Sequence, residues 1–184
     1  MVLPLSLLKI LKVAQDNPRD YAFAVFLADT GCRIAEVCCL QVSALLLDAG
    51  LAIVQGKGGD ERIRPIKPMT VRALRVWLEY RNDGDSPWVF PGRYGDALTV
   101  SGGYLLIERL ARKANVKEHW NPHAWRHGFA REWLMSEGDL ASLQDSLGHS
   151  DIQVTNQFDF VKRAELWYNF PNCCVIAVPV SVVV

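Results

Sequence analysis

Residues 123–158 read HAWRHGFAREWLMSEGDLASLQDSLGHSDIQVTNQF, and this stretch contains most of the residues that we predict to be functional. Its first part carries His123 and Arg126. Its later part carries His149 in a Leu-Gly-His-Ser turn and ends at Phe158. Core packing alone does not require two histidines and an arginine within an otherwise apolar stretch. We therefore predict that His123, Arg126 and His149 form a phosphate-binding pocket.

The first two of these cations are predicted to share one face of a helix. Asn121 and Pro122 are a good N-cap and first-turn pair for a helix running to about residue 136. His123 and Arg126 are three residues apart, so they lie on the same side of that helix. The free N–H groups and the dipole of the first turns favour a bound anion, and an arginine can grip two phosphate oxygens at once.

Three further predicted site residues come from other segments. His149 directly precedes Ser150, which forms a capping box with Gln153 at the start of the next predicted helix. Arg33 follows a glycine helix stop, and Lys57 lies in a glycine-flanked turn where a long cation can swing over a ligand. Several cations at helix starts and turns suit a dianionic phosphorane transition state.

Each of these residues also has a simpler interpretation. A single histidine at a helix start is more often a capping residue than a catalyst. Arg33 with Glu36 is consistent with a surface ion pair that contributes little. A hairpin turn needs glycine whatever Lys57 does, and the spacing of a P-loop is absent.

We expect no metal and no cofactor. His119, His123 and His127 are spaced four apart, which resembles a zinc-binding pattern. However, Pro122 falls between the first two, and we expect no carboxylate or cysteine to complete such a site.

The rest of the chain predicts an α+β fold that is mostly helical, with one small antiparallel sheet. Two short strands, 51–54 and 62–66, surround the glycine-rich turn as a hairpin, and Pro65 places the second strand at an edge. Asp16, Asn17 and Pro18 are predicted to break the chain between the first two helices. The predicted helices are 5–15, 21–28, one from about 33, 68–80, 99–115, 122–136, 139–147 and one from 150.

Composition indicates an ordinary globular domain. The 184 residues are 50% hydrophobic and 22% charged, with a formal net charge of zero. Basic residues gather in 57–75 and 109–131, and acidic residues dominate 132–165. This segregation is compatible with one basic face for a polyanion, or equally with solvated helix faces. The five cysteines form no C-x-x-C motif, and with no signal peptide they indicate free thiols in a reducing interior.

Four segments together resemble a known family. Thr30-Gly-Cys-Arg-Ile-Ala-Glu-Val37, Gly56-Lys-Gly-Gly-Asp-Glu-Arg62, His123-Ala-Trp-Arg126 and Leu147-Gly-His-Ser150 occur in this order at sensible separations. In this combination they resemble the catalytic domain of the tyrosine recombinases, the phage-integrase family of DNA strand-exchange enzymes. The resemblance extends over about residues 5–165.

The resemblance implies a role for each cation. Arg33 and Arg126 match the two arginines that clamp the scissile phosphate. Lys57 matches the hairpin lysine that is thought to protonate the departing 5′ oxygen. His123 and His149 match the two histidines that assist proton transfer and hold the phosphate.

The resemblance also implies a nucleophile that this chain lacks. The family tyrosine lies nine residues beyond the second histidine and forms a 3′-phosphotyrosyl link, but Phe158 occupies that position here. Phenylalanine has no attacking oxygen, so we expect this chain to bind DNA without cleaving it. Tyr168 is a poor substitute, because ten residues of helix span about 15 Å. An introduced Tyr-to-Phe change and a natural loss both remain open, and the alternative function is a non-catalytic DNA-binding protein derived from a tyrosine recombinase.

The domain organisation and partners follow from the same resemblance. We expect a catalytic domain over residues 1–170 and no core-binding domain ahead of it. Residues 171–184 form an apolar tail that docks as a strand, either on its own chain or on a neighbour. The implied partners are double-stranded DNA and further copies of the chain in a tetrameric synapse. We expect no membrane association and a cytoplasmic protein of prokaryotic or viral origin.

Overall fold

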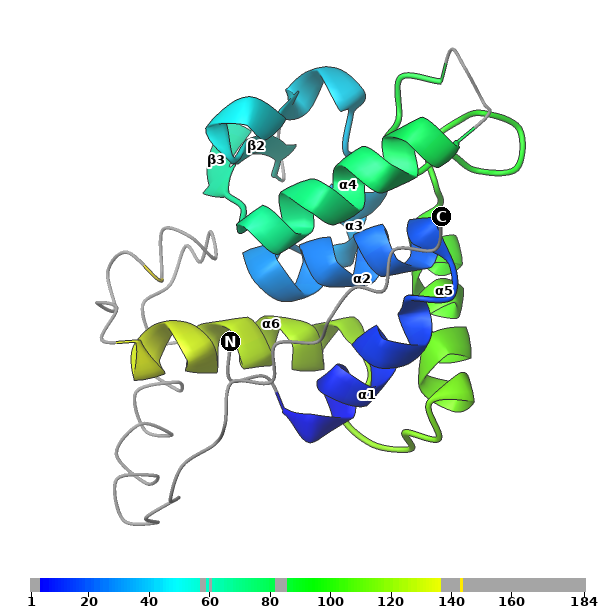
Figure 1. Cartoon of the computed structure of the whole chain (residues 1–184), viewed down its shortest axis with the longest axis vertical. Coiled ribbons are helices and arrows are strands. Elements are labelled where there is room, and N and C mark those ends of the chain that lie inside the picture. Colours follow the sequence, from blue (N-terminus) through cyan, green and yellow to red (C-terminus); the bar gives the residue numbers. More distant parts are fainter. Residues whose placement is uncertain (1–3, 57–58, 60, 82–85, 137–142, 144–184) are drawn as a thin grey trace.

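The computed structural model describes residues 4–56, 59, 61–81, 86–136 and 143 (Figure 1). Helices dominate this part of the chain, and one three-stranded antiparallel sheet accompanies them, which confirms the predicted fold class. The α-helices are α1 (Leu5–Ala14), α2 (Pro18–Thr30), α3 (Ile34–Cys38), α4 (Pro68–Tyr80), α5 (Val100–Lys113) and α6 (Pro122–Met135). The short elements are η1 (Val42–Ala44), β1 (Leu45–Leu46), η2 (Leu47–Ala49), β2 (Leu51–Gln55) and β3 (Glu61–Pro65).

Some predicted features lie outside the described residues. These are the predicted helix 139–147 apart from residue 143, the helix predicted from Ser150, and the apolar tail from residue 171. None of the helices within the described ranges is long and apolar enough to cross a membrane.

The sheet has the order β1-β2-β3, so β3 is an edge strand and carries Pro65 where the sequence predicted an edge. The hairpin of β2 and β3 pairs Ala52 with Arg64 and Ile53 with Ile63. The pairing of β1 with β2 was not predicted, because two residues are too few to show an alternating pattern.

The second helix begins earlier than predicted. Asp16, Asn17 and Pro18 do separate the first two helices, but α2 starts at Pro18 rather than at Tyr21. Pro18 occupies the first turn, where its missing N–H costs no hydrogen bond. The side chain of Asn17 accepts a hydrogen bond from the backbone N–H of Asp20 at 3.1 Å, so the predicted breaker is an N-cap.

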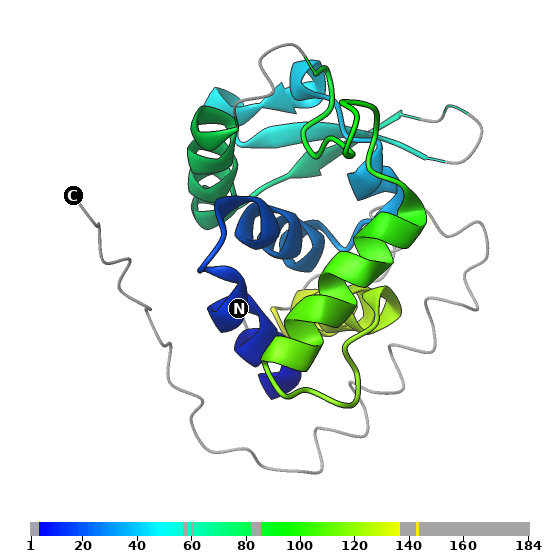
Figure 2. The ribbon, with the colours of Figure 1, turned by 90° about the vertical axis from the view of Figure 1, so that its right-hand side faces the viewer.

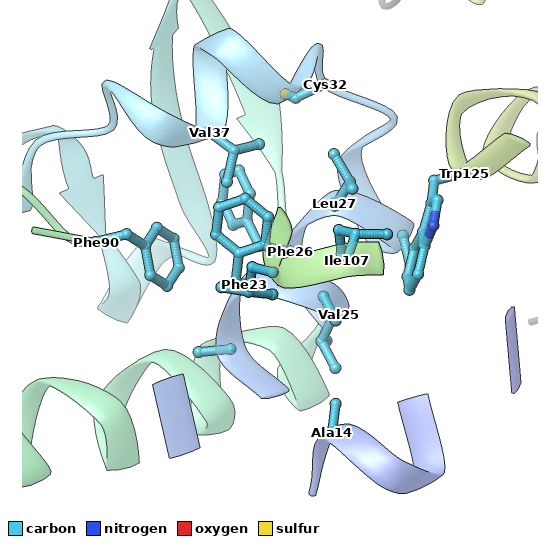
Figure 3. Packing of buried hydrophobic residues seen from close by; sticks show 14 of the residues in the cluster. Ala14, Phe23, Val25, Phe26, Leu27, Cys32, Val37, Phe90, Ile107 and Trp125 are labelled. Atoms are coloured by element: carbon cyan, nitrogen blue, oxygen red, sulfur yellow. The ribbon is translucent and has the colours of Figure 1, made fainter. Parts of the chain in front are cut away.

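Helix α2 is the centre of the core. It lies between α4 with the sheet on one side and α1 with α6 on the other (Figures 1 and 2). Phe23 and Phe26 of α2 are completely buried, and Figure 3 shows both among side chains from several elements. The ring of Phe23 meets that of Phe90 edge-on, with centroids 5.1 Å apart. A helix buried on every side shows no amphipathic stripe, which fits the continuous apolar run of residues 22–28.

The end of α2 touches α6 closely at Gly31. Gly31 has a left-handed backbone, with φ of 59°, and its N–H donates to the carbonyl of Leu27. A Cβ atom added there would lie 2.5 Å from Cδ1 of Phe129 on α6. The carbonyl of Gly31 accepts a hydrogen bond from Nη1 of Arg126 at 2.8 Å. Glycine is therefore required at this junction for its backbone conformation and for its lack of a side chain.

We predict that Gly31→Ala lowers the free energy of unfolding by about 2 to 4 kcal/mol, because it combines a strained φ with overpacking against Phe129. Chemical denaturation measures this change. Gly95→Ala is the matched control, since Gly95 also has a positive φ (86°) but nothing within 4 Å of an added Cβ. Equal losses in the two variants would show that the contact with Phe129 contributes nothing.

Candidate functional site

Three of the six predicted site residues lie in the described part of the chain, around the junction of α2, α3 and α6. Arg33 is the N-cap residue of α3, two residues after Gly31. His123 and Arg126 lie in the first two turns of α6, where His123 is exposed and Arg126 is partly buried. The structure thus brings Arg33 and Arg126 together from positions far apart in the sequence. Lys57, His149 and Phe158 lie outside the described residues.

The predicted start of α6 is confirmed. Asn121 is the N-cap, and its Oδ1 accepts a hydrogen bond from the N–H of Ala124 at 3.0 Å. Pro122 occupies the first turn. Trp125 is fully buried and donates its indole N–H to the carbonyl of Trp120 at 2.9 Å, which fixes the rotation of the helix about its axis. Arg126, the next residue, is therefore directed toward Gly31 by a rigid element.

The positive charge of Arg126 lies in an unfavourable electrostatic environment. Burial, and then repulsion from Arg33, lower the pKa of Arg126 to about 10. The guanidinium still carries its charge at neutral pH, so two like charges are kept close together. An anion bound between them would relieve both the repulsion and the lost hydration.

His127, one residue further along α6, belongs to the same electrostatic environment. Burial, and then the neighbouring His123 and Arg126, lower its pKa below the ordinary histidine value. Among the described residues, no group of three or more His, Cys, Asp or Glu side chains could hold a metal ion.

Glu36 positions Arg33. Its carboxylate accepts hydrogen bonds from the backbone N–H of Arg33 at 2.7 Å and from Nη1 of Arg33 at 3.1 Å. It also accepts one from Nη2 of Arg62 on β3 at 3.1 Å. The ion pair of Arg33 with Glu36 that the sequence suggested is present, but it is not confined to the surface, because the Glu36 side chain is only 5% exposed. A buried carboxylate shared by two arginines holds Arg33 in place and ties α3 to the sheet.

A second polar cluster holds α6 against α2 and α4. The buried carboxylate of Asp29 accepts hydrogen bonds from the N–H of Lys67 at 2.7 Å and from Oγ1 of Thr70 at 2.6 Å. Nζ of Lys67 lies 3.4 Å from Asp29 and 2.9 Å from Glu132 of α6. Lys67 therefore bridges two helices and fixes the helix that carries His123 and Arg126.

Sequence comparison matches this architecture to one family. The model of the phage integrase family matches residues 5–163. The chain belongs to the phage integrase family.

Curated members of the family with similar sequences are named tyrosine recombinase XerC. That of Xylella fastidiosa (strain M23) is 38% identical over 148 residues, which are 79% of this chain and 50% of that protein. That of Xanthomonas campestris pv. campestris (strain B100) is 37% identical over 165 residues, which are 86% of this chain and 51% of that protein. The chain thus spans about half the length of these relatives.

Solved structures of recombinases share the fold. XerA recombinase superposes with a TM-score of 0.78 at 24% identity, covering 94% of this chain and 66% of that chain. XerH site-specific recombinase, in a pre-cleavage complex with its difH substrate, superposes with a TM-score of 0.71 at 23% identity, covering 89% and 53%. These likenesses show that the chain shares the fold of these recombinases.

We predict that Glu36→Gln lowers the free energy of unfolding by about 2 kcal/mol, because two arginines lose their shared carboxylate while Arg33 stays nearly half exposed. Urea denaturation measures the loss. Glu108→Gln is the matched control, since Glu108 pairs with Arg112 on the exposed surface of α5 and its loss should cost at most about 0.5 kcal/mol. Similar values for the two variants would contradict a positioning role for Glu36.

Proposed function

We propose that the protein is a DNA strand-exchange component that acts in site-specific recombination, with Arg33 and Arg126 binding the scissile phosphate. The observation that carries the proposal is the pair of guanidinium groups held together at the α2–α3–α6 junction despite their mutual repulsion. Such a pair suits a phosphodiester, which is anionic and offers oxygens to both arginines. Membership of the phage integrase family supports the same assignment.

The proposed chemistry is a two-step phosphoryl transfer. A tyrosine hydroxyl at position 158 would attack the phosphorus, the bond to the 5′ oxygen would break, and Lys57 would protonate that oxygen. A 5′ hydroxyl of another strand would then attack the phosphotyrosine, forming a new phosphodiester and releasing the tyrosine. His123 and His149 would assist proton transfer and hold the phosphate. One phosphodiester replaces another of similar energy, so the exchange needs no nucleotide cofactor.

This chain carries Phe158 and cannot form the covalent intermediate, so we propose that it binds DNA without cleaving it. The proposed partners are double-stranded DNA and further copies of the chain assembled on it. Residues 1–170 would form the catalytic domain, and 171–184 would form the tail that docks on its own or a neighbouring chain. XerH, a structural neighbour, is described in complex with its DNA substrate before and after cleavage.

We predict that Phe158→Tyr restores covalent attachment to DNA. The probe is a pool of nicked duplexes with randomised cores, in which release of a short strand traps the adduct, and denaturing gels detect the protein–DNA band. Adding Arg126→Ala to the restored chain should lower the yield at least about a hundredfold, because the transition-state charge loses a buried partner.

Two outcomes separate the proposal from its alternative. The unaltered chain is the control and should give no adduct. If Phe158→Tyr also gives none while the chain still selects particular sequences from the pool, the protein is a non-catalytic DNA-binding relative of the recombinases. Phe158 itself is the observation that favours this second function.

A further inference from the structure

The edge strand β3 turns its arginines inward. Side chains alternate between the two faces of a strand, and the apolar ones ordinarily face the core. In β3 the pattern is reversed, because Ile63 is 64% exposed whereas Arg64 is only 4% exposed and Arg62 is largely buried. The reversal costs apolar burial and places two charges inside, so it calls for an explanation.

Arg62 has one. Its Nη2 donates to Glu36, the carboxylate that also positions Arg33. Arg64 has no comparable partner. Its Nε is buried without a hydrogen bond. Within the described residues, the Arg64 side chain makes no hydrogen bond and no ion pair. Its cross-strand partner is Ala52, whose small side chain leaves room for a long one beside it.

Arg81 shows how the charge of a structural arginine is matched in this protein. Arg81 is partly buried and donates to the backbone carbonyls of Ser86 and Trp88, so its charge is matched by carbonyl dipoles that close a loop. Arg64 shows no such matching within the described residues. Burying an unmatched guanidinium is costly, and the cost is recovered only when an anion arrives.

The surroundings of Arg64 indicate where that anion would bind. Burial raises the pKa of the Cys32 thiol, and the charge of Arg64 opposes that rise, so Arg64 lies close to the residue that precedes Arg33. Arg64 also adds to the repulsion felt by Arg126. Geometry indicates the same side of the sheet: Arg62 and Arg64 share one face of β3, and Arg62 donates to Glu36, which also binds Arg33. The charges of Arg33 and Arg64 both act on Arg126.

We propose that Arg64 is a third arginine of the phosphate site, which supplies a buried positive charge to the DNA phosphate held between Arg33 and Arg126. This inference rests on the proposed function and deepens it. Arg33 and Arg126 grip the phosphate oxygens, and Arg64 raises the positive potential beneath them, where solvent does not screen it.

The test compares Arg64→Met, Arg64→Lys and the unaltered chain. Methionine keeps an unbranched apolar stem of similar length and removes the charge. Affinity for a short fluorescein-labelled duplex of random sequence is measured by anisotropy over a range of salt concentrations. Thermal melting without DNA is measured in parallel, and circular dichroism confirms that each variant is folded.

We expect Arg64→Met to weaken DNA binding about tenfold and to reduce the slope of log Kd against log salt by about one, as loss of one phosphate interaction requires. Without DNA its melting temperature should be equal or higher, because an unmatched buried charge has been removed. Arg64→Lys should keep the slope of the unaltered chain. Arg112→Gln on the surface of α5 is the matched control and should keep it too.

An unchanged affinity and slope in folded Arg64→Met would overturn the inference, as would a slope in Arg64→Lys that falls as far as in Arg64→Met. Failure of the proposed function gives a different result. In that case the unaltered chain itself shows no salt-dependent DNA binding, which overturns the proposed function and this inference with it.

Discussion

The contact between Gly31 and α6 is the constraint on which the candidate site depends. At this point the backbone of α2 turns left-handed, the ring of Phe129 fills the space of a missing side chain, and Arg126 donates to the Gly31 carbonyl. One residue therefore ends the central helix, seats α6 and anchors a guanidinium. Arg33 follows two residues later, so the same turn sets the separation of the two arginines.

Polar networks around this junction keep like charges together. Glu36 binds Arg33 and Arg62, while Asp29 and Glu132 bind Lys67. Each carboxylate is largely buried and each joins two or more elements, so the rigidity of the site comes from side chains that do not touch a phosphate. Under the proposed function, preorganisation of this kind would let the site bind a phosphate without rearranging.

Local signals in the sequence predicted much of this architecture. The N-cap at Asn121, the stop at Gly31 and the hairpin are set by residues close to one another in the chain, and the structure confirms them. Partners distant in sequence were not predictable in this way. Glu36 is buried together with its partner Arg62, which lies on another element. In β3 the arginines face inward while Ile63 is exposed. Neither feature follows from the periodicity of apolar residues.

The most direct test of the proposed phosphate site is a crystal structure of the chain with duplex DNA. We propose that Phe158 prevents cleavage, and on that proposal the complex should be captured intact. We predict one DNA phosphate within hydrogen-bonding distance of both Arg33 and Arg126, at the start of α6. DNA bound over another face, with both guanidinium groups away from any phosphate, would contradict it.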